Sequence, residues 1–150
     1  MRLVIESNQS ISLLHLCLLS SDKGRRLAGL GWITDTGSSN GTYMAHCHYV
    51  NSALVAEALA VREGLSTCID KGFRRVHCKS DSLQLIKAIN SGSPSPEIYG
   101  VVSDIISLSL AFDCISFTWI QRGNNKEADA LAKQALLNES YVIASLDNGA

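Results

Sequence analysis

The sequence predicts a single α/β domain with a mixed β-sheet. Its 150 residues suit one domain with one core, and 46% of them are apolar while 18% are charged, as in ordinary globular proteins. Three strand-like runs separated by turn residues fill the first third of the chain, which is typical of an antiparallel meander. The hydrophobic period then switches repeatedly between helical and strand spacing, which indicates helices packed on a sheet with parallel strands.

The expected meander covers about residues 11–49. Its runs are ISLLHLCLL (11–19), RLAGLGWIT (26–34) and TYMAHCHYV (42–50), and the turn-forming DTGSSNG joins the last two. The first run has the length of a signal-peptide core. However, Glu6 precedes it, and no basic cluster or small-residue cleavage site flanks it, so we expect a buried strand.

The remaining elements follow from periodicity. Apolar residues recur at helical spacing from Asn51 to Gly72, and RRVHCKSD then alternates as a strand. SLQLIKAINSG is typical of a short helix, and SPSP breaks the chain before a helical run from Glu97 to Phe112. CISFTWI is a fifth strand, and a last helix completes the order βββαβααβα before a polar tail over 138–150.

The last helix begins in NNKEADALAKQAL, residues 124–136. Asn124 can cap its first turn, while Glu127 reaches back in a capping box. The apolar stripe of this helix ends at Leu136, and Asp129 lies about 20° beyond that edge. A carboxylate at the border of a buried face costs free energy unless a cation or donors replace its water. The helix dipole and solvent suffice for one such Asp, so a specific partner is indicated only if other acids converge there.

Two further acids are candidates. Glu57 lies beside Cys68 at the edge of the apolar stripe of the 51–72 helix, where it either snorkels to solvent or has a specific partner. Asp81 ends a strand and begins a helix. It therefore either caps that helix, as Ser80 or Ser82 could instead, or faces the crevice at the carboxyl ends of the strands.

Glu57, Asp81 and Asp129 come from a helix, a strand end and a helix start that would pack on one sheet. Carboxylates gathered at one point repel each other and raise each other's pKa unless a hard cation binds them. Oxygen ligands without nearby Cys or His favour Mg²⁺ or Mn²⁺ over Zn²⁺. We therefore take these three acids as the candidate metal ligands and catalytic residues.

Four phrases carry a resemblance to a known family: AGLGWI, AEALAVREGL, CKSDSLQLIKAI and WIQRGNNKEADALAKQAL. Their order and spacing resemble the ribonuclease H-like domain of plant reverse-transcriptase-derived, non-LTR retroelement-like proteins, over residues 27–137. The resemblance implies a ribonuclease H-like fold, whose five-stranded mixed sheet has three antiparallel first strands. It also implies endonucleolytic hydrolysis of RNA in RNA–DNA hybrids with two Mg²⁺ or Mn²⁺ ions. By matching motif, Glu57, Asp81 and Asp129 would be metal ligands of that site.

The start of the chain departs from the family pattern, so we separate an atypical region, 1–26, from the core, 27–137. The family has an acid on its first strand, whereas ISLLHLCLL has none. The nearest acid, Asp22, lies only seven residues before Gly29 and is more typical of a turn. The loop QRGNN also lacks the histidine that some ribonucleases H use in product release. The alternatives are an active hybrid ribonuclease, a catalytically impaired nucleic-acid-binding module and a purely structural domain.

Charge and cysteine content limit which binding partners and which cellular compartment we expect. The net charge of −1 gives no global sign of nucleic-acid binding, so any such site must be local. Five scattered Cys without a C-x-x-C pair favour an intracellular protein, nuclear or cytoplasmic and not secreted. No apolar run approaches the roughly 18 residues of a membrane span, and we expect a monomer.

Several side chains have competing interpretations. His46 and His48 could suggest zinc, but no second Cys/His cluster exists, so we expect an exposed strand face. Trp32 and Trp119 are expected in the core rather than as base-stacking platforms. Two basic clusters could contact phosphates: Lys23, Arg25 and Arg26, and Lys71, Arg74 and Arg75.

Overall fold

The computed structural model describes the backbone of residues 11–20 and 27–147 and the side chains of residues 27–138. The strands are β1 (Ile11–Ser20), β2 (Leu27–Asp35), β3 (Asn40–His48), β4 (Arg75–Ser80) and β5 (Cys114–Trp119). The helices are α1 (Ala53–Asp70), α2 (Leu83–Ser91), α3 (Tyr99–Ser109) and α4 (Lys126–Asp147). Two short 3₁₀ helices, η2 (Pro96–Ile98) and η3 (Arg122–Asn124), precede α3 and α4. The predicted α/β class is confirmed.

The strands form one sheet in the order β3-β2-β1-β4-β5. β1, β2 and β3 pair antiparallel, as expected for the meander, whereas β4 runs parallel to both β1 and β5. β1 is the central strand, and its register places His15 opposite Ser80 and Leu16 opposite Gly31. The carboxyl end of β4 therefore lies beside the middle of β1.

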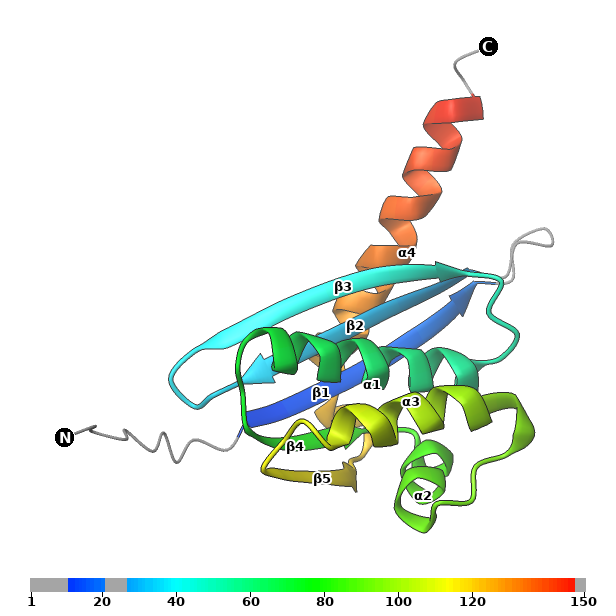
Figure 1. Cartoon of the computed structure of the whole chain (residues 1–150). Coiled ribbons are helices and arrows are strands. Elements are labelled where there is room, and N and C mark those ends of the chain that lie inside the picture. The colour runs from blue at the N-terminus through cyan, green and yellow to red at the C-terminus, as the bar shows by residue number, and fades with distance from the viewer. Residues whose placement is uncertain (1–10, 21–26, 148–150) are drawn as a thin grey trace.

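The helices cover the sheet unequally (Figure 1). α1 packs on β1 and β2, with α2 and α3 beside it, whereas α4 lies on the opposite face against β1, β2 and β3. β2 is covered from both sides, which explains why all its residues from Leu27 to Thr34 are buried. The later turns of α4 extend past the rim of the sheet.

Small residues allow α4 to pack directly on β2. A Cβ atom at Gly31 would lie 2.5 Å from the carbonyl oxygen of Ala128 and 2.8 Å from the amide nitrogen of Ala132. Ala128 and Ala132 are themselves fully buried. The backbone of α4 thus rests on the backbone of β2, and this close approach fixes where the first turn of α4 begins.

Two predicted features of α4 need correction. The amide of Asp129 donates to the carbonyl of Asn125, whereas Asn124 belongs to η3, so Asn125 and not Asn124 precedes the first turn. The helix also continues to Asp147, so the tail expected from residue 138 is helical over most of its length. Polarity suggested a tail, but the sequence between 126 and 147 contains no Gly or Pro to end the helix.

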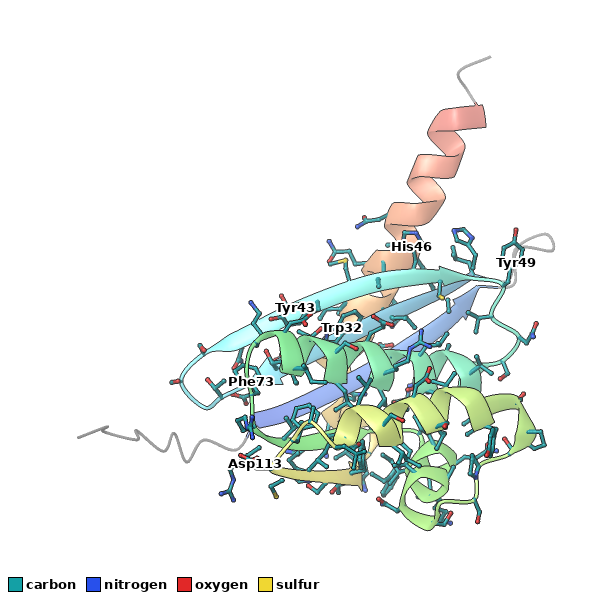
Figure 2. All side chains as sticks on the ribbon, viewed as in Figure 1. Trp32, Tyr43, His46, Tyr49, Phe73 and Asp113 are labelled. Atoms are coloured by element: carbon teal, nitrogen blue, oxygen red, sulfur yellow. The ribbon has the colours of Figure 1, made fainter. Side chains whose placement is uncertain are left out.

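The two tryptophans differ in burial. Trp32 is a core residue as expected: it stacks on Tyr43, and its indole N–H donates to Thr67 Oγ1 at 3.0 Å (Figure 2). The expectation for Trp119 was wrong, because its side chain is 43% exposed at the end of β5, where no neighbouring strand follows.

Histidines and thiols complete the fold. His46 and His48 lie on the exposed face of β3 as predicted, with their rings edge to face. Cys47, Cys68, Cys78 and Cys114 are free thiols. In the part of the chain that the structure describes, no helix is long and apolar enough to cross a membrane.

Candidate active site

Asp81 lies at the carboxyl end of β4, where its side chain is only 6% exposed. Ser82 is the cap of α2, since its hydroxyl accepts from the amide of Leu85, and Ser80 Oγ accepts from the amide of Ser82. Capping therefore does not account for Asp81. Its carboxylate is left to face η3 and the start of α4, where Arg122 Nε lies 4.0 Å from Oδ2.

Asp129 is in the first turn of α4, with its side chain 23% exposed. One oxygen, Oδ2, pairs with Lys133 Nζ one helical turn later at 2.8 Å. The other, Oδ1, is buried and has no hydrogen-bond partner in the described chain. A buried carboxylate oxygen without a donor is costly, so Asp129 is suited to a cation that approaches from the side away from Lys133.

The environment of Asp81 includes the charge of Asp129. Burial raises the pKa of Asp81 above the ordinary carboxyl value, and the charge of Asp129 adds to this shift. Arg122, a backbone amide and the side-chain amide of Asn125 oppose it. The structure therefore brings Asp81 close enough to Asp129 for its charge to act on Asp81, although 48 positions separate these two acids in the sequence.

Glu57 is placed differently. It is buried in α1, on the sheet face opposite α4. Among the residues that the structure describes, no group of three His, Cys, Asp or Glu side chains is close enough to hold a metal ion. The assignment of Glu57 as a third metal ligand therefore stays a prediction.

The central strand carries no acid beside this pair. The register places Leu16 opposite Gly31, at the level where α4 crosses β2 next to Asp129. The sequence of β1 contains neither Asp nor Glu. Asp22, the nearest acid in the sequence, lies outside the described residues.

Sequence reasoning missed three neighbours of the pair: Arg122, Asn125 and Lys133. Lys133 was detectable, because a Lys four residues after an Asp is the common spacing of a helical ion pair. Arg122 and Asn125 belong to the η3 turn, and their approach to Asp81 depends on how that turn folds back over the sheet. Each acid thus already lies beside a positively charged side chain: Arg122 beside Asp81, and Lys133 beside Asp129.

The acid pair meets the basic requirements of a single hard-cation site. Carboxylate oxygens are the ligands that Mg²⁺ and Mn²⁺ prefer, and the unsatisfied Oδ1 of Asp129 supplies one directly. A cation would also offset the cost of burying the charged Asp81, which raises its pKa, and the smaller repulsion from Asp129. A second ion finds less support, because β1 offers no carboxylate to share between two ions.

The start of α4 also borders a cavity of about 340 Å³, which lies between this end of the helix and the β2–β3 hairpin. Neither Asp81 nor Asp129 lines it. Asp35 and Asn40 line it from the hairpin, and Asn124 and Lys126 line it from the other side. Its wall thus combines polar groups of both signs next to the helix that carries Asp129.

One predicted basic cluster lies at the far end of β4. Arg74 and Arg75 stand at its amino end, six and more residues before Asp81. Arg74 forms a two-point pair with Asp113, with distances of 2.6 and 3.1 Å, at the start of β5 (Figure 2). This pairing raises the pKa of Arg74 and lowers that of Asp113, so Arg74 is already engaged. The other cluster, Lys23 to Arg26, falls outside the described residues.

Comparisons with known proteins agree with the fold of this chain. The sequence pattern of a family described as reverse transcriptase-like matches residues 20–135. The search of curated proteins returned no match. Similar solved structures include RNase H1 from Halobacterium salinarum NRC-1, with 23% identity, a TM-score of 0.73, and coverage of 86% of this chain and 98% of that one.

Two further structures are similar to this chain. The N-terminal RNase H domain of a Mycobacterium tuberculosis protein has 19% identity and a TM-score of 0.77, covering 90% of this chain and 99% of that one. LC11-RNase H1, isolated from compost and solved in complex with an RNA/DNA hybrid, has 19% identity and a TM-score of 0.74, covering 86% and 98%. At these identities the likeness establishes a ribonuclease H-like fold.

Proposed function

Because the chain belongs to the reverse transcriptase-like family and has a ribonuclease H-like fold, we propose that it binds RNA–DNA hybrids and cleaves their RNA strand only slowly. The observation that carries this proposal is the placement of two largely buried acids, Asp81 at the end of β4 and Asp129 at the start of α4, without an acid from β1. The hybrid bound in the similar LC11-RNase H1 structure supports the choice of nucleic acid.

In this proposal Asp81 and Asp129 hold a divalent ion, and Glu57 is a further ligand from α1. When bound, Mg²⁺ or Mn²⁺ would lower the pKa of a coordinated water and stabilise charge on the scissile phosphate. The chain's own residues orient the substrate: contacts to the 2′-hydroxyl in the wide minor groove would distinguish the RNA strand from DNA.

Two features of the described residues argue for slow cleavage. The central strand supplies no carboxylate to bridge a second ion, so the attacking water is poorly positioned. Arg122 and Lys133 also neutralise part of the acid pair, which reduces its attraction for divalent cations. Binding would persist because contacts to phosphates do not depend on the acids.

The second candidate function is rapid two-ion hydrolysis. The buried position of Glu57 in α1 favours it, because a buried carboxylate in this family's motif matches a metal ligand. This candidate requires a fourth carboxylate, for which Asp22 is the nearest in sequence.

A labelled RNA–DNA hybrid separates the candidates. The protein is incubated with hybrid in Mg²⁺ and in Mn²⁺, beside the variants Asp81→Asn and Asp22→Asn, with Asp113→Asn as an exposed control at the other end of the sheet. We expect hybrid binding by all four proteins and slow RNA cleavage that only Asp81→Asn abolishes. Rapid cleavage lost with Asp22→Asn would establish the two-ion enzyme, and failure of the unmodified chain to bind hybrid would refute the proposal.

A further inference from the structure

The face of β4 and β5 on the α4 side is open and polar. α4 packs on β1, β2 and β3, and its contacts in the described chain are concentrated on these three strands rather than on β4 and β5. Because side chains alternate along a strand, Arg75, His77 and Lys79 of β4 share this face, and the alternating burial of the strand agrees: Val76, Cys78 and Ser80 are buried against the helices. Ser116 and Thr118 are the exposed counterparts on β5.

This face is cationic. Arg75 and Lys79 lie on it, and the sequences of β4 and β5 contain no Asp or Glu at all. The nearest acid at the amino end of the face, Asp113, forms a two-point pair with Arg74, and Arg75 also contributes to its lowered pKa. An anionic partner would therefore meet two positive side chains without competition from carboxylates on the same strands.

Hydroxyl and imidazole donors stand between the cations. His77 Nε2 lies 2.7 Å from Thr118 Oγ1, which fixes both side chains across the two strands. Burial and the neighbouring Lys79 lower the pKa of His77, so the ring is neutral at pH 7 and offers a hydrogen-bond donor or acceptor rather than a charge. Such a mixture of cations and neutral polar groups is typical of contacts to a phosphate and sugar backbone.

The carboxyl end of this face adjoins the acid pair, because Asp81 directly follows β4. From Arg75 to Asp81 the strand rises about 20 Å, at roughly 3.3 Å per residue. Arg122, which is 69% exposed beside Asp81, extends the positive surface past the end of β5. A nucleic-acid strand bound at Asp81 and Asp129 could therefore run along this face without leaving the protein.

We propose that the open face formed by Arg75, His77 and Lys79 of β4 with Ser116 and Thr118 of β5 binds the phosphate backbone of the nucleic-acid strand that continues past the acid pair. This inference rests on the proposed hybrid binding and locates part of the contact. The recognition is electrostatic and independent of base sequence, because the contacts go to phosphate groups.

The test is the salt dependence of hybrid binding. Dissociation constants for a blunt RNA–DNA hybrid of 18 base pairs are measured over a range of KCl without divalent ions, so that metal binding at the acids does not contribute. The variant Arg75→Gln/Lys79→Gln removes both charges from the face. The matched control, Arg62→Gln/Lys87→Gln, removes two charges from α1 and α2 on the helical side of the sheet. Circular dichroism and urea unfolding check that both variants fold.

Loss of two phosphate contacts should reduce the slope of log K against log[KCl] by about 1.8, at roughly 0.9 per contact, while the control keeps the slope of the unmodified chain. Equal slopes for the face variant and the unmodified chain would overturn this inference and leave hybrid binding intact. A control that loses as much slope as the face variant would also overturn it, because the effect would then be one of net charge. An unmodified chain that does not bind hybrid would instead refute the proposed function itself.

Discussion

Substitution of Gly31 by Ala tests whether the close approach of α4 to β2 positions the candidate site. Gly31 lies in the middle of β2, and an added Cβ would stand 2.5 Å from the carbonyl oxygen of Ala128 and 2.8 Å from the amide nitrogen of Ala132. These are backbone atoms, so no side-chain rotation can relieve the contact. Ordinary contact begins at 3.4 Å. The first turns of α4 must therefore move by about 1 Å, which is large for a well-packed interface.

The expected cost follows from this displacement. Overpacking of a well-filled core costs about 1–3 kcal/mol, and we expect the upper half of that range because two backbone atoms are affected. Asp129 directly follows Ala128, so its carboxylate moves with the helix relative to Asp81. Gly31→Ala should therefore both destabilise the fold and weaken any effect of Mg²⁺ on its stability.

Urea unfolding followed by tryptophan fluorescence measures this effect, because the neighbouring Trp32 is buried. The control is Gly100→Ala in α3, where an added Cβ meets nothing within 4 Å. Since Ala is the better helix former by up to about 1 kcal/mol, the control should unfold at the same or a higher urea concentration. A Gly31→Ala protein as stable as the unmodified chain would refute the direct packing of α4 on β2.

Three further predictions concern the site and its supporting helix. Burial raises the pKa of Asp81, so the charged carboxylate destabilises the fold at pH values above this raised pKa. Asp81→Asn should therefore raise the urea midpoint at pH 7.5. This gain in stability should vanish as the pH falls below the ordinary carboxyl pKa, where the unmodified side chain is protonated in both states. Mg²⁺ should raise the melting temperature of the native chain, and Asp129→Asn should abolish the rise; equal shifts in both proteins would exclude this metal site. Ser82→Ala removes the cap that accepts from Leu85 and should cost about 1 kcal/mol in urea unfolding, whereas an unchanged midpoint would show that the cap is unimportant.

Much of the fold could be predicted because its signals are local. The helical stripe of α1 and the alternation of β4 are set by which side chains within a few residues share a face, so both elements follow from periodicity. The errors are also local. Asn124 and Asn125 are equally good caps in the sequence, and only the folded η3 turn determines that α4 starts after the second. The tail from 138 was judged by polarity, but helix continuation depends on the absence of a breaker.

The sequence by itself pointed to Glu57, Asp81 and Asp129, because these acids come from a helix, a strand end and a helix start that would pack on one sheet. It left open whether Asp81 capped α2, since Ser82 beside it has the same capability. Only the tertiary structure decided that Ser82 caps, that the charge of Asp129 reaches Asp81, and that Arg122 and Lys133 accompany these two acids. The physical reason is that a cap depends on hydrogen bonds within one turn, and a hydrophobic stripe depends on the spacing of residues along one helix. The meeting of two acids 48 positions apart depends instead on which strands pair and on how closely α4 can approach β2, and both are set by burial summed over the whole sheet.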